Sequence, residues 1–209
     1  MPKFPGPPEP AALARVPPTL RVLPAGTRLC RVYFRGGNHP ALWYDFRAYG
    51  PVATARFDHQ PDPPHLDETR AVLYAALAGP TCLAEVFQDR RLIDRHHRAP
   101  WLVHCRLAAD LSLLDLTGTW PTRAGASMAL SSGPRARARA WSRAIYAAYP
   151  AVQGLLYPSS MYRHARCVAL YERALAAIPE TPSLHLPLAA PALEPLLRRV
   201  AADIGYGLV

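Results

Sequence analysis

The sequence is almost without lysine. Lys3 is the single lysine, so 23 of the 24 basic residues are arginines, against 15 acidic residues and a net charge of +9. An arginine-, alanine- and proline-rich chain is typical of a GC-rich genome. Arginine is also the residue best suited to phosphate, because its guanidinium fork can donate to two oxygens at once. Composition therefore leaves two explanations open, genomic bias and selection for an anionic ligand.

Segments for membranes and export are missing as well. No window of 18 apolar residues is free of both proline and charge, which argues against a transmembrane helix. The N-terminus, MPKFPGPPEP, has no apolar segment of signal-peptide length. We therefore expect a cytoplasmic protein that makes no contact with a membrane.

Motifs for common cofactors and nucleophiles are also missing. The chain has neither a GxGxxG loop nor a GKS or GKT phosphate loop. The histidines at 96, 97 and 104 lack a matching ligand set, so no metal is expected. The Tyr157-Pro-Ser-Ser160 segment lacks the glycine-flanked elbow of a serine hydrolase. No CxxC pair occurs, and we expect buried free thiols at Cys30, Cys82, Cys105 and Cys167.

The sequence does contain enough apolar residues for a core, since half of them are hydrophobic. The pattern predicts short strands and few helices, which indicates a single α+β domain of short mixed strands. The expected strands lie at 27–34, 71–75, 101–107, 112–116, 154–157 and 167–171, and the expected helices at 81–91, capped by Thr81, 135–149 and 191–204.

Prolines suggest where this domain begins and ends. We expect a proline-rich arm at 1–24, lying on the surface or disordered, and the domain itself at 25–178. A proline-rich C-terminal extension with a short helix is expected at 179–209.

Three charged residues stand where apolar neighbours dominate. Arg31 lies inside an otherwise apolar strand, Arg56 follows a loop, and Glu85 lies within the most apolar helical turn. Charges in such surroundings are rare unless they are paired or functional. They indicate either a structural Arg–Glu pair, or a pocket with arginines for a pyrophosphate and one carboxylate for a sugar.

A run of arginines at 135–139 precedes Trp141 and has the composition of a nucleic-acid patch. Trp141 belongs to the apolar stripe of the helix expected there, together with Ala138 and Ile145. A solvated helix face explains the arginines better, so direct nucleic-acid binding is not expected.

Seven segments together resemble the RES domain, a family named for its Arg, Glu and Ser. They occur in the family's order and cover roughly residues 28–175. The segments are Leu29-Cys-Arg-Val-Tyr33, Ala55-Arg-Phe-Asp58, Val72-Leu-Tyr-Ala75, Cys82-Leu-Ala-Glu-Val86, Leu113-Leu-Asp-Leu-Thr-Gly118, Gly154-Leu-Leu-Tyr-Pro-Ser159 and Cys167-Val-Ala-Leu-Tyr171. The sequence departs from the family's pattern at Ala55, where glycine is usual, which is expected to narrow the approach of the backbone to a ligand.

This resemblance implies a fold like that of ADP-ribosyltransferases, with NAD as substrate. It further implies a toxin of a bacterial toxin–antitoxin pair that cleaves the nicotinamide–ribose bond, with inorganic phosphate as co-substrate in NAD+ phosphorylases. The implied partner is an Xre-type helix-turn-helix antitoxin that plugs the active site. The site residues carried over by motif are Arg31, Arg56, Tyr74, Glu85 and Ser159.

These residue types suit that chemistry. Glu85 is expected to stabilise positive charge on the ribose, as in glycoside hydrolysis. Arg31 and Arg56 are expected to bind the pyrophosphate or the incoming phosphate. Tyr74 offers a ring for stacking, or is a core tyrosine, and Ser159, or its neighbour Ser160, offers a hydroxyl. Two alternatives remain open: transfer of ADP-ribose to a protein, and a basic nucleic-acid-binding module.

Overall fold

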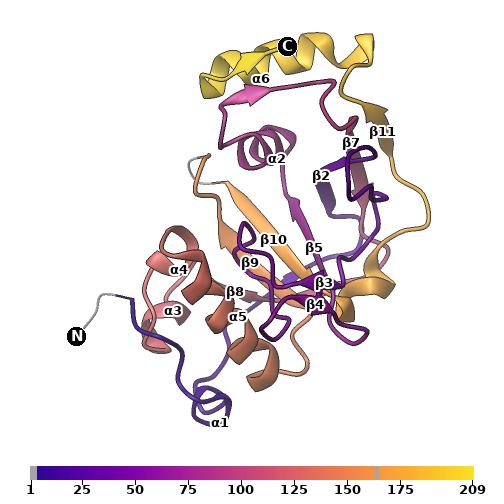
Figure 1. Cartoon of the computed structure of the whole chain (residues 1–209). Coiled ribbons are helices and arrows are strands. Elements are labelled where there is room, and N and C mark those ends of the chain that lie inside the picture. Colours follow the sequence, from indigo (N-terminus) through magenta and orange to yellow (C-terminus); the bar gives the residue numbers. More distant parts are fainter. Residues whose placement is uncertain (1–3, 163–164) are drawn as a thin grey trace.

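The computed structural model describes residues 4–162 and 165–209, and a mixed sheet of eight strands forms its centre (Figure 1). The sheet order is β1-β8-β9-β10-β5-β2-β7-β11. Within it, β8 and β9 run parallel and the other neighbours run antiparallel. These strands are β1 (Leu20–Leu23), β2 (Arg28–Phe34), β5 (Val72–Ala76), β7 (Pro100–Arg106), β8 (Leu111–Asp115), β9 (Gly154–Pro158), β10 (Arg166–Tyr171) and β11 (Leu184–Pro187).

Short elements surround the sheet, and the expected α+β architecture is confirmed. Two small sheets pair β3 (Tyr49–Gly50) with β4 (His65–Leu66), and β6 (Leu92–Ile93) with β12 (Gly207–Leu208). The helices are α1 (Pro10–Leu13), α2 (Gly79–Val86), α3 (Trp120–Arg123), α4 (Ala129–Ser132), α5 (Arg135–Ala148) and α6 (Glu194–Ile204), with 3-10 turns η1 (Glu172–Ala177) and η2 (Pro191–Leu193).

Helices cover the two ends of the sheet separately. Figure 1 shows α1, α3, α4 and α5 at one end, and α2 and α6 at the other. Trp141 and Ile145 of α5 are fully buried in the first group, as the apolar stripe predicts. Leu83 of α2 and Leu197 of α6 are buried in the second. Burial of one such side chain contributes about 1.5–3 kcal/mol, so each helical group is anchored by its own core.

The sheet is split near its middle. β2 pairs with β7 from Arg28 to Phe34, but with β5 only where Cys30 faces Ala76. Beyond that pair the two strands are not hydrogen-bonded to each other, and at the start of β5 Val72 pairs with Arg47 instead. The split lies between the two helical groups.

Both proline-rich termini take part in this domain. Leu13 of α1 is fully buried beside α5, and the Tyr149 hydroxyl lies 2.8 Å from the carbonyl oxygens of both Leu13 and Val16, which share its one proton. β1 adds an edge strand to β8, and β11 adds one to β7. The central sheet therefore extends beyond 25–178 at both ends, through pairings between residues that are far apart in sequence.

The helix expected at 81–91 is shorter and begins earlier, at Gly79, and ends at Val86. Pro80 lies in the first turn, where its missing N–H and fixed φ suit a helix start. Thr81 is therefore inside the helix and its role as the cap is wrong, since the N-cap is Ala78. The helix expected at 191–204 is confirmed as η2 followed by α6.

The four cysteines are buried and free, as expected. Burial raises the pKa of the Cys82 thiol to about 12, so it stays protonated at neutral pH. In the described part of the chain, no helix has the length and apolar character needed to cross a membrane.

Candidate active site

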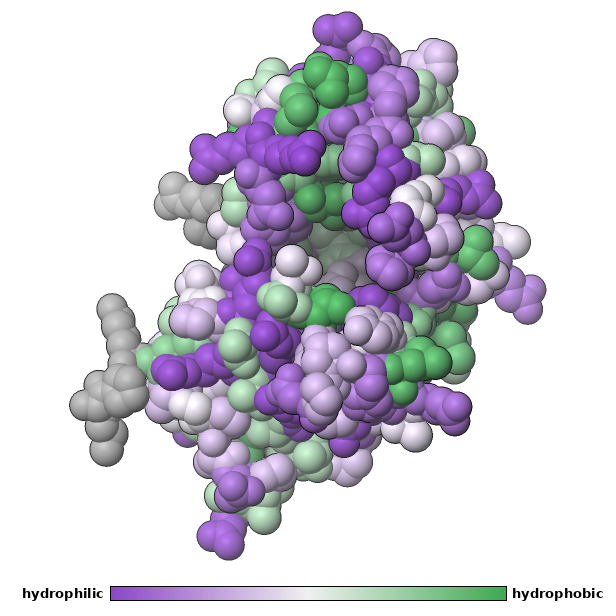
Figure 2. Space-filling model, in the orientation of Figure 1, coloured by the Kyte–Doolittle hydropathy of each residue, from purple (hydrophilic) through white to green (hydrophobic). Residues whose placement is uncertain are grey.

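A cavity of about 920 Å³ lies beside the split between β5 and β2, and α2 and the start of α5 contribute to its wall. This volume is near the upper end of the roughly 300–1,000 Å³ that is usual for ligand pockets. Figure 2 shows the cavity as a hollow with an apolar floor and a mostly hydrophilic rim. Among the described residues, its lining includes five arginines and two acidic residues: Arg31, Arg47, Arg56, Arg98, Arg135, Asp45 and Glu85. The excess of positive charge suits a large anionic ligand.

Arg31 reaches the cavity from β2. Its Nη1 donates to the carbonyl oxygens of Trp43 and Asp45, at 2.9 and 3.0 Å. Burial lowers the pKa of Arg31 to about 10, which still leaves the guanidinium charged at neutral pH. Both hydrogen-bond partners are backbone oxygens, so the 43–45 loop orients the guanidinium without a salt bridge, although the Asp45 carboxylate also acts on its charge. This arrangement is not the Arg–Glu pair that the sequence left open.

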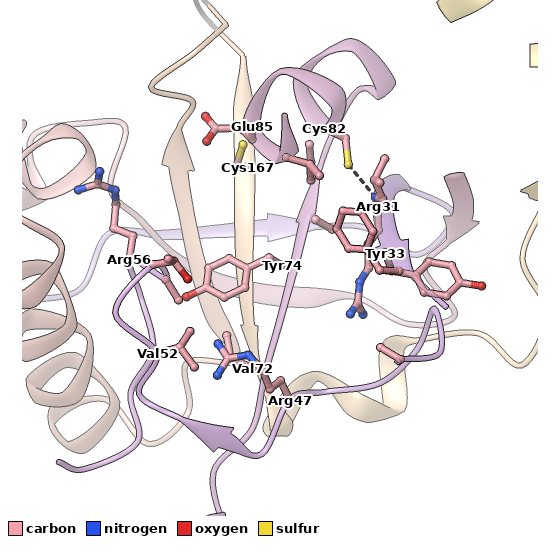
Figure 3. A pocket seen from close by; sticks show the side chains of 18 of the residues that line it. Arg31, Tyr33, Arg47, Val52, Arg56, Val72, Tyr74, Cys82, Glu85 and Cys167 are labelled. Atoms are coloured by element: carbon pink, nitrogen blue, oxygen red, sulfur yellow. Dashed lines mark hydrogen bonds between the residues drawn. The ribbon is translucent and has the colours of Figure 1, made fainter. Parts of the chain in front are cut away.

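Tyr74 of β5 forms the middle of the cavity, between Arg31 on one side and Arg56 on the other (Figure 3). Its hydroxyl donates to Asp58 Oδ1 and accepts from the Phe57 N–H, both at 2.9 Å. Burial, followed by the nearby Asp58 carboxylate, raises the pKa of Tyr74 well above its usual value. The hydroxyl is thus protonated and already engaged, so Tyr74 can offer a ligand its ring.

Asp58 does not line the cavity but supports Tyr74 from behind, a role that the sequence, which placed Asp58 in a motif, did not indicate. It is fully buried, and its carboxylate also accepts from Arg47 Nη2 at 2.6 Å and the Val52 N–H at 2.8 Å. A buried carboxylate is stable only when it is paired and hydrogen-bonded in this way. Asp58 therefore fixes both the Tyr74 ring and the Arg47 guanidinium. The sequence analysis missed this role of Asp58, and it missed Arg47. The signal in the sequence that could have indicated this role was an aspartate directly after Arg56-Phe57 in the motif.

Arg56 lies on the loop before Asp58, on the same side of the cavity as Glu85 (Figure 3). Its Nη1 donates to the Gly133 carbonyl at 2.6 Å. Burial lowers the pKa of Arg56, and the second cause is the positive charge of Arg135. The neighbouring Ala55 lines the cavity and is not among the residues with positive φ. Alanine therefore stands there without backbone strain.

Glu85 lies in the last turn of α2 and points towards the cavity (Figure 3). Its Oε1 accepts from Ser159 Oγ at 2.5 Å and from the Ser160 N–H at 2.9 Å. Ser159 Oγ in turn accepts from the backbone N–H groups of Met161 and Tyr162, at 3.1 and 2.9 Å. The turn after β9 therefore orients the carboxylate through Ser159. It is Ser160, not Ser159, that lines the cavity.

The arginines of α5 form the solvated face expected from sequence only in part, since Arg137 is exposed whereas Arg135, Arg139 and Arg143 are half-buried. Arg139 donates to the carbonyls of Ala53 and Ala55, at 3.0 and 3.1 Å, and Arg143 pairs with Asp62 at 3.0 Å. Both residues hold the 52–62 loop against the helix, which leaves them less available to nucleic acid. Arg135 instead lines the cavity. Sequence could not separate these roles, because they depend on where the loop crosses α5.

The structure thus brings Arg31, Arg56, Tyr74 and Glu85 together around one cavity, with Ser159 behind Glu85. Within residues 4–162 and 165–209, no group of three or more His, Cys, Asp and Glu side chains is placed to hold a metal ion.

Comparisons with known proteins identify the fold and the family of the chain. The chain superposes on a chain of the crystal structure of the M. tuberculosis MbcT–MbcA toxin–antitoxin complex, with a TM-score of 0.57 and 17% identity. The match covers 91% of this chain and 97% of that one, and shows a shared fold. No curated protein sequence matches significantly. The RES domain model matches residues 28–189, most of the chain. The chain therefore belongs to the RES domain family.

Proposed function

We propose that this protein is the toxin of a toxin–antitoxin pair and cleaves the nicotinamide–ribose bond of NAD+, with inorganic phosphate as the acceptor. The observation that carries the proposal is a single cavity in which arginines surround an aromatic ring and one serine-oriented carboxylate. A dinucleotide presents the matching groups: an anionic pyrophosphate, a ribose with hydroxyls and two flat bases. Membership of the RES family supports the same substrate.

Arg31 and Tyr74 would position this substrate. The Arg31 guanidinium has donors beyond the Nη1 group that the 43–45 loop occupies, and these suit pyrophosphate oxygens. The Tyr74 ring is fixed by Asp58 and offers a flat apolar face for stacking. Fixed partners of this kind orient a substrate without reorganisation when it binds.

Glu85 would stabilise the charge that develops during cleavage. The C1′–N bond breaks with its electron pair on the nicotinamide nitrogen, so nicotinamide leaves neutral and needs no acid. Positive charge then builds on the ribose, and a carboxylate fixed by two donors is already oriented towards it. An oxygen of phosphate forms the new bond to C1′, which gives a phosphorylated ADP-ribose.

The reaction is tested by incubating the purified chain with NAD+ at increasing phosphate concentrations and identifying the products. The rate should rise and saturate with phosphate. Arg56→Lys should weaken this dependence, because an ammonium lacks the fork of a guanidinium. Free ADP-ribose formed at a rate indifferent to phosphate would mean hydrolysis instead, and label from radioactive NAD+ found on protein would mean ADP-ribosyl transfer.

The toxin role is tested separately by expression in bacteria. Since NAD+ is a cytosolic metabolite, we place the protein in the cytoplasm, where its expression should deplete NAD+ and stop growth. Co-expression of a neighbouring helix-turn-helix protein of the Xre type should restore growth by covering the cavity. Normal growth and unchanged NAD+ pools, with soluble protein present, would contradict the toxin role.

A further inference from the structure

We propose that Arg135, together with Arg56, forms a phosphoryl-binding subsite on the Glu85 side of the cavity. The subsite would take either free phosphate, as the attacking acceptor, or the pyrophosphate of the dinucleotide. This inference rests on the proposed function for its biological meaning, but its binding chemistry can be measured without any turnover.

The first observation is two like charges in the lining of one cavity with no salt bridge to either among the described residues, although the Glu85 carboxylate acts on Arg56 from a longer distance. Both guanidiniums line the cavity, and Arg135 acts electrostatically on Arg56. In the part of the chain that the structure describes, none of the ion pairs within 4.0 Å includes either residue. Two neighbouring cations disfavour each other unless an anion lies between them.

The second observation is that Arg135 differs from the other arginines of α5. Arg137 donates to the Phe4 carbonyl, Arg139 to carbonyls of the 52–55 loop, and Arg143 pairs with Asp62. Each of these stabilises a contact within the fold. No such contact is found for the Arg135 side chain among the described residues, and Arg135 lines the cavity. A charge that the fold does not use is available to a ligand.

Arg56 can also bind a phosphoryl group. Its hydrogen bond to Gly133 ties it to the segment just before Arg135, so both residues belong to the same part of the cavity lining. That bond uses one donor group of a guanidinium that has five N–H donors, so the rest remain for a ligand. The 14-residue α5 also starts here without a side-chain cap or an acidic residue in its first turn. Its dipole therefore adds to the positive potential.

The position next to Glu85 explains why two arginines are needed. A phosphate dianion is repelled by the Glu85 carboxylate, which lines the same cavity. Two guanidinium groups offset that repulsion, whereas water needs no such help. The subsite would therefore favour phosphate over water close to the carboxylate that stabilises the ribose.

The test measures binding of inorganic phosphate alone, and of ADP alone, by calorimetry with the full chain. Arg135→Gln should weaken binding of at least one of them by about 10- to 100-fold, the effect expected for loss of charge-assisted hydrogen bonds. Arg135→Lys should lie between, because it keeps the charge and loses the fork. Arg137→Gln, on the same helix, is the matched control and should bind as the wild type does.

The outcomes separate the sources of the anion and the two proposals. Weakening confined to phosphate assigns the subsite to the acceptor, weakening confined to ADP assigns it to the pyrophosphate, and weakening of both assigns a shared subsite. Equal binding by wild type and Arg135→Gln, or no binding by the wild type, overturns the subsite. Binding through Arg135 in a protein that leaves NAD+ intact would refute the reaction and keep the subsite. NAD+ cleavage by a protein whose binding of phosphate and ADP is the same in the wild type and Arg135→Gln would keep the reaction and refute the subsite.

Discussion

At the scale of residues, Ser159 and Ser160 contribute differently although they are neighbours. Ser159 donates through its hydroxyl to Glu85, whereas Ser160 donates through its backbone N–H. Ser159→Ala therefore removes a hydrogen bond to a charged group, which is worth about 1.5–3 kcal/mol. We expect kcat for NAD+ cleavage to fall about 10- to 100-fold, with a smaller change in KM.

Ser160→Ala is the matched control, because alanine keeps the backbone N–H that Glu85 accepts. It should retain most of the activity. A larger loss in Ser160→Ala than in Ser159→Ala would contradict the positioning role of Ser159 and favour a direct contact of the Ser160 hydroxyl with substrate.

At the scale of elements, η1 is joined to the 59–71 segment by Glu172. The Glu172 carboxylate accepts from the Tyr146 hydroxyl at 2.6 Å, from the Ala71 N–H at 3.2 Å, and lies 3.2 Å from His59 Nε2. Burial alone raises the pKa of Glu172, but the hydrogen bonds outweigh it and lower the pKa from 4.5 to about 2. The ionised form is therefore favoured in the folded protein.

A depressed carboxylate pKa stabilises the fold above the unfolded value and loses that effect as pH falls through the folded value. The free energy of unfolding should thus decrease between pH 4.5 and about 2, beyond the general effect of acid. Glu172→Gln should flatten this decrease in urea titrations at several pH values. Glu180→Gln, at an exposed position, should keep the wild-type pH dependence. Identical profiles for Glu172→Gln and the wild type would contradict this role.

The proline-rich N-terminal segment is a second element whose role can be tested. Leu13 is fully buried, whereas Val22 of the edge strand is 53% exposed. Leu13→Ala should lower the free energy of unfolding by about 2–5 kcal/mol, the usual effect of such a truncation in a core. Val22→Ala should change it much less. Denaturant unfolding that is equal for both variants would show that the segment does not anchor to the domain.

At the scale of the whole molecule, sequence predicted the local features and missed those that depend on distant contacts. Apolar runs gave the central strands and the α5 stripe, because burial of Trp141 and Ile145 follows directly from helical spacing. β1 was missed because it forms by pairing with β8, where Leu20 faces Leu114, and a contact between residues so distant in sequence leaves no local signal.

The residues of the candidate site also fall into those that the sequence predicted and those that it missed. Arg31, Arg56, Tyr74 and Glu85 were identified through short motifs, and the cavity contains them all. Arg47 and Arg135 were missed, because neither carries a local signal that sets it apart from the many other arginines. Their positions depend on how the 47–58 loop and the start of α5 meet beside the split sheet.

The most direct measurement is nicotinamide release from NAD+ by the wild type and Glu85→Gln, at saturating phosphate. Glutamine keeps the size of Glu85 and removes its charge. The variant should lose activity by about 100- to 1,000-fold, as expected when one oriented electrostatic stabiliser is removed, and its Tm should stay close to that of the wild type. Full activity in Glu85→Gln would contradict the assignment of this carboxylate, and no nicotinamide from either protein would contradict the proposed reaction itself.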